Sequence, residues 1–590
     1  MPVRAPRSWS VARWAAIALI AVSSRQALAD GPRGAEWVGK DAIVYVEATH
    51  PEILLDRLYD PKMQERLAAI PQYDKFLKSP KFEELKNGVQ FVSMLLDTKW
   101  DEGLRKLASG GVVLAIEAEP GKGPVPFVAV TPSDPAFLKK AHAKLLEIAR
   151  NDAKTKGNPD PIRESSHRGV KIYSLGKDQA HAIVKDTLVI SHSADLLKRV
   201  VERALDGSKE SLTSNPQWKA RRAKVADDTL AWGLVRLDRL REIDKKFVVA
   251  EPTNPGPTFL FGQWIDAFRR APWAAAQIRW TDSNLGAEVT MPTPPGGYSD
   301  TYKKFLPPKG EAALQPLKPK GTIASLSLWR DVSAVWEVRN DLFAPEVVQG
   351  LAQLDTFAGQ YFGGRDFGSG ILGAIGPDWR LVVAEQDYGT IKPVPDNKLP
   401  AFALVIDLKP DDDDFAQRLK VAFQSFIGLA NLGAAQSKAP PLELGSETVD
   451  GVTIATSHFM AAKTTPGAKE SVHQRQNYSP SAAQVDNHFI LSSSLGLTKD
   501  LIPVLRQPVK QTDVTAMLTA DGSTLVHLLE LNRGRLVSQN MLEKGNDKAT
   551  ASAQIDLLLN LIRYAGAGTL TARDNPDAVE FRLDFALGAK

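Results

Sequence analysis

The order of the expected strands and helices occurs twice along the chain, and this repeat constrains the fold more than any other feature. Three apolar strands are expected in each half, at 43–46, 112–117 and 126–130, then at 323–328, 381–385 and 400–406. The third strand of each half leads into a helix-start signal and an amphipathic helix. A repeat of this length is too long for one solenoid unit, so it indicates a duplicated domain.

Shorter matches extend the repeat through each half. They are GVKI at 169–172 with GVTI at 451–454, Ser191 with Ser492, Thr229 with Thr524, and a hairpin at 278–291 with one at 570–583. Several strands occur in adjacent pairs rather than alternating with helices, which favours α+β units with mixed or antiparallel sheets covered by helices. We therefore predict two similar units, 30–291 and 322–590. Two unrelated α+β domains with similar periodicity are the alternative.

Three further segments bear on this organisation. Residues 292–321 contain seven prolines, which interrupt helices and strand ladders, so we expect a linker or a strap along the surface. Residues 463–481 are polar and rich in turn formers, and we expect an exposed loop there. Helices at 259–270 and 551–563 are expected to cover one sheet face.

The first 29 residues have the pattern of an export signal. Arg4, Arg7 and Arg13 precede a short apolar run at 14–22, and Ala27-Leu28-Ala29 provides a cleavage site before Asp30. An uncleaved anchor is the alternative, but it would need about 20 apolar residues. No later stretch approaches transmembrane length. We therefore expect removal of residues 1–29 and a soluble mature protein in the periplasm or outside the cell.

Charge and cysteine content exclude some classes of function. The net charge of +4 equals the contribution of the four arginines in residues 1–29, so the expected mature chain is neutral. Binding of nucleic acid or an anionic membrane by bulk charge therefore loses its support. The chain has no cysteine, so it forms no disulfide, and a core of this size does not need one.

Three motifs suggest chemistry but have simpler explanations. Residues Gly368 to Gly373 fit G-x-G-x-x-G, but no convincing strand precedes them and no helix follows, so we expect close backbone packing instead of nucleotide binding. The acidic run Asp411 to Asp414 is contiguous and opens a helix, which favours capping over calcium binding. The basic stretch from Lys219 to Lys224, after Trp218, is expected to be a solvated helix face and not a phosphate-binding patch.

No metal or catalytic residue is assigned. The nine histidines occur in none of the usual metal-binding spacings and are His50, His142, His167, His181, His192, His458, His473, His488 and His527. Of these, His192 and His527 are expected on strand or strand-end positions of opposite halves. They could form a ligand site together, but partly buried structural histidines are favoured. Ser492, Ser493 and Ser494 lack a G-x-S-x-G context, so we expect them to cap the next helix.

Four short motifs connect the chain to a known family. They are Ser79-Pro80 with Phe82-Glu83-Glu84-Leu85, Gly110-Gly111-Val112, Arg168-Gly169-Val170, and Gly376-Pro377-Asp378-Trp379. In these motifs the chain resembles a family of exported bacterial proteins of unknown function. The resemblance covers most of the mature chain. It implies that the protein is exported, and it implies no particular activity.

Three hypotheses for function follow. The leading one is a non-catalytic exported protein that binds a partner or an envelope component in a groove made by the two halves. The second is a hydrolase with a site in one half, for which His192, Ser492 and His527 are the candidates. The third is a carrier of an apolar ligand. None of them requires a metal, a nucleotide or another cofactor, so neither a chelator nor a nucleotide should change the melting temperature.

Overall fold

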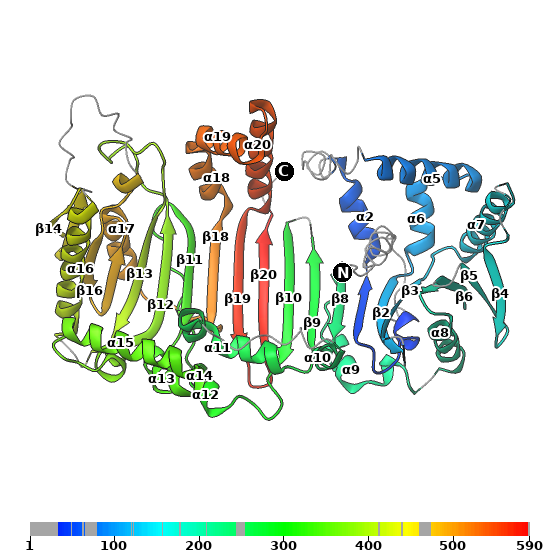
Figure 1. The fold of residues 1–590 in the computed structure, drawn as a ribbon, viewed down its shortest axis with the longest axis horizontal. Coiled ribbons are helices and arrows are strands. Elements are labelled where there is room, and N and C mark those ends of the chain that lie inside the picture. The colour runs from blue at the N-terminus through cyan, green and yellow to red at the C-terminus, as the bar shows by residue number, and fades with distance from the viewer. Residues whose placement is uncertain are drawn as a thin grey trace, which may run out of the picture. The chain divides into compact units, whose positions relative to one another are not determined.

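The chain forms two compact units in a computed structural model (Figure 1). The structure describes residues 33–587, apart from 49, 62–63, 65–78, 120, 122, 156, 158, 176–178, 208, 244–253, 282, 411–413, 438–439 and 460–473. Unit 1 contains the described residues up to Val248 together with Pro272–Thr290, and unit 2 contains those of Val249–Ala271 and Met291–Lys590. The expected signal peptide, most of the acidic run and much of the loop at 463–481 lie outside the described residues.

Unit 1 is an antiparallel sheet with the strand order β10-β9-β8-β1-β2-β3-β7-β6-β5-β4. The strands are β1 (Val44–Ala48), β2 (Val112–Glu119), β3 (Gly123–Val130), β4 (Ile162–His167), β5 (Val170–Leu175), β6 (Gln179–Val184), β7 (Thr187–Ser191), β8 (Thr229–Val235), β9 (Ala274–Trp280) and β10 (Asn284–Pro292). Its helices are α2 (Pro51–Tyr59), α5 (Pro80–Leu96), α6 (Trp100–Ala108), α7 (Pro135–Thr155), α8 (Ala194–Asp206), α9 (Pro216–Arg222) and α10 (Leu237–Ile243).

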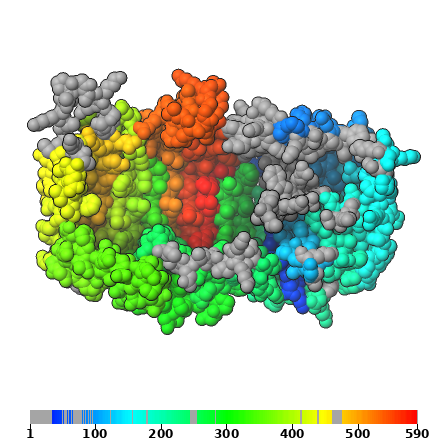
Figure 2. All heavy atoms as spheres, in the orientation of Figure 1, coloured from blue at the N-terminus to red at the C-terminus, as the bar shows by residue number. Residues whose placement is uncertain are grey.

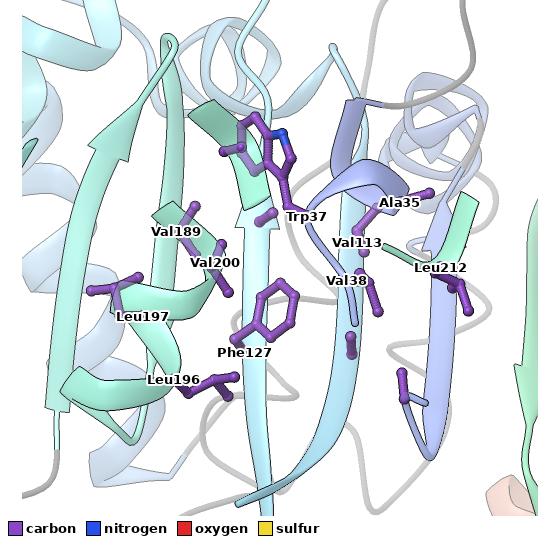
Figure 3. Packing of buried hydrophobic residues seen from close by; sticks show 14 of the residues in the cluster. Ala35, Trp37, Val38, Val113, Phe127, Val189, Leu196, Leu197, Val200 and Leu212 are labelled. Atoms are coloured by element: carbon purple, nitrogen blue, oxygen red, sulfur yellow. The ribbon is translucent and has the colours of Figure 1, made fainter. Parts of the chain in front are cut away.

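The core of unit 1 lies between one face of this sheet and α8. Buried side chains of α8 recur at helical spacing, and Leu196, Leu197 and Val200 lie beside Phe127 and Val189 of the sheet (Figure 3). Burying each of these side chains contributes roughly 1.5–3 kcal/mol. The helix begins at a serine cap and ends at Gly207, which has a left-handed backbone.

Unit 2 has the strand order β20-β19-β18-β11-β12-β13-β17-β16-β15-β14, again antiparallel throughout. The strands are β11 (Thr322–Trp329), β12 (Ile375–Ala384), β13 (Ala401–Leu408), β14 (Leu442–Val449), β15 (Val452–Phe459), β16 (Ser481–Val485), β17 (His488–Ser492), β18 (Ala516–Asp521), β19 (Ala567–Asp574) and β20 (Ala578–Ala586). When β1 is matched with β11 and each later strand in turn, this order is the same as in unit 1. The α+β class is confirmed.

Some helices of unit 2 lie near the ends of its strands, whereas α16 and α17 pack along the sheet (Figure 1). They are α11 (Pro255–Arg270), α12 (Asp300–Lys303), α13 (Val332–Glu337), α14 (Arg339–Leu342), α15 (Pro345–Tyr361), α16 (Phe415–Ser437), α17 (Leu495–Leu505), α18 (Gly522–Leu531), α19 (Arg533–Lys544) and α20 (Lys548–Ala565). Within the described ranges, no helix combines the length and the apolar character needed to cross a bilayer.

Two details of the predicted repeat are wrong. Thr229 opens strand β8, but Thr524 lies in helix α18, because the Asp521 carboxylate accepts a hydrogen bond from the Thr524 amide at 2.7 Å and caps that helix. Strand β18 occupies the position that matches β8. Helix α20 also departs from the expectation, since its buried residues pack against α18 and α19 and not against a sheet face.

The proline-rich segment 292–321 runs as a strap along unit 2. Phe305 and Ala313 are fully buried, and Ala313 exchanges backbone hydrogen bonds of 2.9 Å with Val514 and Thr512. These two bonds form a short antiparallel-like ladder. They connect the strap to residues 512–514, the loop that precedes β18.

Candidate functional site

One face of the unit 2 sheet carries a line of seven leucines, which we call the leucine row. Each member is the direct partner of the next on adjacent strands from β20 to β17, and the members are Leu583, Leu570, Leu518, Leu326, Leu381, Leu404 and Leu491. Direct partners of an antiparallel pair place their side chains on the same face. At about 4.8 Å per strand, the row is about 29 Å long.

The rows on either side of it are also apolar. One contains Phe585, Gly568, Ala520, Ala324, Val383 and Phe402, and the other contains Phe581, Ala572, Ala516, Leu328, Trp379 and Ile406. None of these positions carries a charge. We call the three rows together the leucine face. The backbone N–H and C=O groups of its inner strands are used in ladders on both sides, so the face offers almost no hydrogen-bonding capacity.

Helices cover only part of the leucine face. Leu260 and Trp264 of α11 pack on Leu328, Ala516 and Ala572, and α15 and α16 cover the end at β13 and β17. Figure 2 shows the surface of β19 and β20 uncovered between α18–α20 and α11.

Between these contacts, some large apolar side chains of the face remain exposed. Leu570 is 40% exposed, Leu381 is 39% exposed and Phe402 is 50% exposed. Contiguous exposed apolar surface is rare on soluble proteins and marks sites of binding.

The opposite face of the same sheet contains a buried ionic cluster. The Asp407 carboxylate accepts hydrogen bonds from Arg380 at 2.8 Å and from His488 Nδ1 at 2.6 Å. Burial, together with the nearby Asp407, raises the pKa of Asp378 to about 6. Leu314 of the strap donates a backbone hydrogen bond to Asp378, so the strap contacts this cluster at that residue. Arg380 and His488 are buried and both are paired with Asp407, and we therefore interpret the cluster as structural.

A second buried cluster holds α11 in place. Arg330 is fully buried and donates to the Leu260 carbonyl and to Gln263, both at 2.9 Å, and also to the Phe305 carbonyl. Burial lowers the pKa of Arg330 to about 9. The half-buried Asp574 carboxylate accepts from Trp264 at 3.1 Å. These bonds join α11, the strap and the sheet.

The three hydrolase candidates are not brought together by any hydrogen bond among the described residues. Ser492 is buried, and its hydroxyl donates to the Ser494 carbonyl at 2.9 Å. His527 lies on helix α18, contrary to the strand position predicted for it, and its Nδ1 lies 2.8 Å from Glu385. That hydrogen bond raises the pKa of His527. His192 follows β7 in unit 1.

The expected capping by the serine clusters holds in only one half. In unit 1, the Ser193 hydroxyl accepts from the Leu196 amide at 3.3 Å and caps α8. In unit 2, Ser494 precedes α17 but makes no side-chain cap. There the Ser479 hydroxyl accepts from the Leu495 amide at 3.0 Å instead.

The glycine motif has a packing role. A Cβ on Gly368 would lie 2.4 Å from Cδ1 of Trp336, so only glycine fits there. The Asp366 carboxylate accepts from the Ser369 amide at 2.6 Å, so this backbone N–H of the motif already has a partner. Helix α15, not a strand, precedes the motif. The segment also borders an open pocket of about 430 Å³, whose lining of Arg365, Asp366 and Lys409 has mixed charge.

The basic stretch is partly structural, which corrects the expectation of a solvated face. Arg222 forms a 2.8 Å ion pair with Glu47, whose side chain is fully buried, and Arg221 lies over the Trp273 ring at 4.3 Å. Lys219 and Lys224 are exposed. Of the acidic run, Asp414 lies in the described residues, just before α16, and pairs with Arg418 at 3.3 Å.

Comparison with known proteins gives little. No protein-family model matches the chain, and no curated protein matches it. Three structures titled crystal forms I, IV and III of TP0453 match with 10%, 8% and 8% identity and TM-scores of 0.23, 0.23 and 0.22. They cover 46%, 45% and 45% of this chain and 82%, 80% and 80% of the other. Likeness at such TM-scores determines neither fold nor function.

Proposed function

We propose that the chain is an exported, non-catalytic binding protein that holds an apolar ligand on the leucine face of unit 2. The observation that carries this proposal is the leucine row, which is charge-free and only partly covered. Removing such surface from water contributes about 25 cal/mol per Å². Export rests on the pattern of residues 1–29 and on the resemblance to exported proteins.

The chemistry of the face indicates the class of ligand. A polar group placed against it would lose its hydrogen bonds to water and gain none, because the inner strands have no free backbone groups. The part of the ligand that lies on the face should therefore be a long hydrocarbon, such as an acyl chain. From Leu583 to Leu381 the row spans about 19 Å at about 4.8 Å per strand, which gives an extended chain continuous contact.

The strand orders support a tandem duplication. On the seven strands of unit 1 that match those of the leucine row, direct partners again form an apolar line, made of Val289, Ala276, Gly233, Val46, Leu114, Val128 and Ile190. We infer that both units derive from one ancestral domain with an apolar sheet face. The hydrolase hypothesis has no comparable support, since no hydroxyl is bonded to His527 in the described part of the chain.

Binding of a fluorescent acyl probe tests the proposal. Cis-parinaric acid titrated into the purified protein should bind saturably. Leu381→Asp or Leu570→Asp should weaken that binding at least about tenfold, because a charge opposes the hydrocarbon. Leu542→Asp is the matched control, since Leu542 is 87% exposed on α19 and away from the face.

A second variant avoids the introduced charge. Ala520 is exposed on the leucine face, so Ala520→Trp should fill it and lower probe binding while the circular dichroism spectrum stays unchanged. Equal binding by wild type and all face variants would contradict the proposal. So would a stable dimer that Leu570→Asp converts to a monomer, since a second copy would then be the occupant.

A further inference from the structure

Two histidines of unit 1 that are 39 residues apart in sequence meet in the fold. His142 lies on α7 and His181 on β6, and their Nε2 atoms are 3.0 Å apart. Their rings are inclined at 74° with centroids 5.1 Å apart. Both side chains are half-buried, so solvent reaches the pair.

An aromatic side chain fixes both imidazoles. Tyr173 of β5 is the direct ladder partner of His181, and its ring stacks on that imidazole at an interplanar angle of 17°. The same tyrosine ring meets His142 edge-on, with centroids 4.9 Å apart. Contacts that restrict both rings preorganise the two nitrogens, so a ligand that joins them loses little side-chain entropy.

We propose that His142 and His181 bind a divalent transition-metal ion, with copper(II) preferred over nickel(II) and zinc(II). Imidazole nitrogen suits these ions, and copper(II) is the strongest binder in the series. Metal–nitrogen bonds of about 2.0–2.1 Å at right angles place two nitrogens about 2.9 Å apart. The Nε2 atoms, which share a hydrogen bond in the absence of an ion, are 3.0 Å apart, close to this value.

Water molecules would fill the coordination positions of the ion that the two histidines leave open. Among the described residues, no group of three or more histidine, aspartate and glutamate side chains is placed to hold a metal. Structural zinc sites use four protein ligands, so a two-histidine site holds an exchangeable ion that folding does not need. This proposal differs from the sequence-based expectation, which assigned no metal ligand among the nine histidines. Sequence spacing could not show it, because the two residues come from different elements.

Copper binding to protein without an affinity tag tests the proposal. Electron paramagnetic resonance should show one bound copper(II) per chain with nitrogen coupling from two imidazoles. His142→Gln and His181→Gln should each lower the affinity at least about tenfold, since loss of even an outer-shell partner costs that much. His458→Gln is the control, because His458 is 61% exposed and pairs only loosely with Glu443 at 3.5 Å.

The spectrum of the wild-type protein gives a readout that does not depend on the folding of any variant. Coupling from one nitrogen or none, or the absence of saturable one-to-one binding, overturns the proposal. An affinity that stays the same in His142→Gln and His181→Gln, or that falls equally in His458→Gln, also overturns it.

Discussion

At the residue scale, Asp378 is the carboxylate in unit 2 whose burial has the clearest consequence for pH dependence. Burial raises its pKa from 3.8 to about 6, and one of its oxygens has no hydrogen-bond partner. Between these two pH values, the folded chain keeps a proton that the unfolded chain releases. The stability that this proton provides is therefore complete below pH 3.8 and is lost as the pH rises through 6.

We expect Asp378→Asn to be more stable than the wild type at pH 7.5, by about 1–2 kcal/mol after allowance for partial solvent access. At pH 4 the two proteins should have nearly the same stability, because both side chains are then neutral in the fold. Urea unfolding at both pH values measures the difference. Asp396→Asn, at an exposed loop position, is the control and should match the wild type. A less stable Asp378→Asn at pH 7.5 would mean that Arg380 stabilises the charge more than burial opposes it.

At the element scale, the two serine-led helices offer a matched comparison. Ser193 and Ser494 precede α8 and α17 after corresponding strands, but only the Ser193 hydroxyl accepts a hydrogen bond from its helix. Ser193→Ala should cost about 1 kcal/mol, and Ser494→Ala clearly less. Amide hydrogen exchange in the first turn of each helix measures the effect. Equal losses in the two variants would contradict a capping role for Ser193.

Sequence patterns identified most elements but not the contacts between them. Strands such as β2 and β13 were predictable because apolar residues run continuously or alternate there. Helix α18 was missed because a short apolar run at 524–529 fits a strand or a helix equally well, and the Asp521 cap decided the outcome. The leucine row depends on the register between β11 and β18, which are far apart in sequence. The contact between His142 and His181 could not be predicted either, because these residues lie on different elements that are far apart in sequence.

At the scale of the whole molecule, the two compact units are not two contiguous halves of the chain. The chain leaves unit 1 before α11, adds that helix to unit 2, and returns to unit 1 for β9 and β10. Sequence periodicity assigned residues 249–271 to the first half, before the predicted boundary near residue 291. In the structure these residues belong to unit 2. Periodicity shows that α11 has an apolar stripe, but it does not show which sheet the stripe covers.

This arrangement predicts the behaviour of the second half in isolation. A chain of residues 291–590 lacks α11, so Leu328 and Ala516 lose the cover of Leu260 and Trp264. Arg330 also loses its acceptors on α11, the Leu260 carbonyl and the Gln263 side chain. Each buried donor left without a partner costs about 1–3 kcal/mol, in addition to the lost apolar burial. We expect residues 291–590 alone to aggregate or to melt well below the full chain.

Supplying α11 should restore the fragment. A synthetic peptide of residues 249–271, added to the fragment, should raise its melting temperature, because a ligand that binds only the folded state stabilises that state. The same peptide with Trp264→Ala should raise it less, since it loses both packing on Phe581 and the hydrogen bond to Asp574. Thermal unfolding followed by circular dichroism measures both effects. If the fragment without peptide melts at the temperature of the full chain, α11 is not an integral part of unit 2.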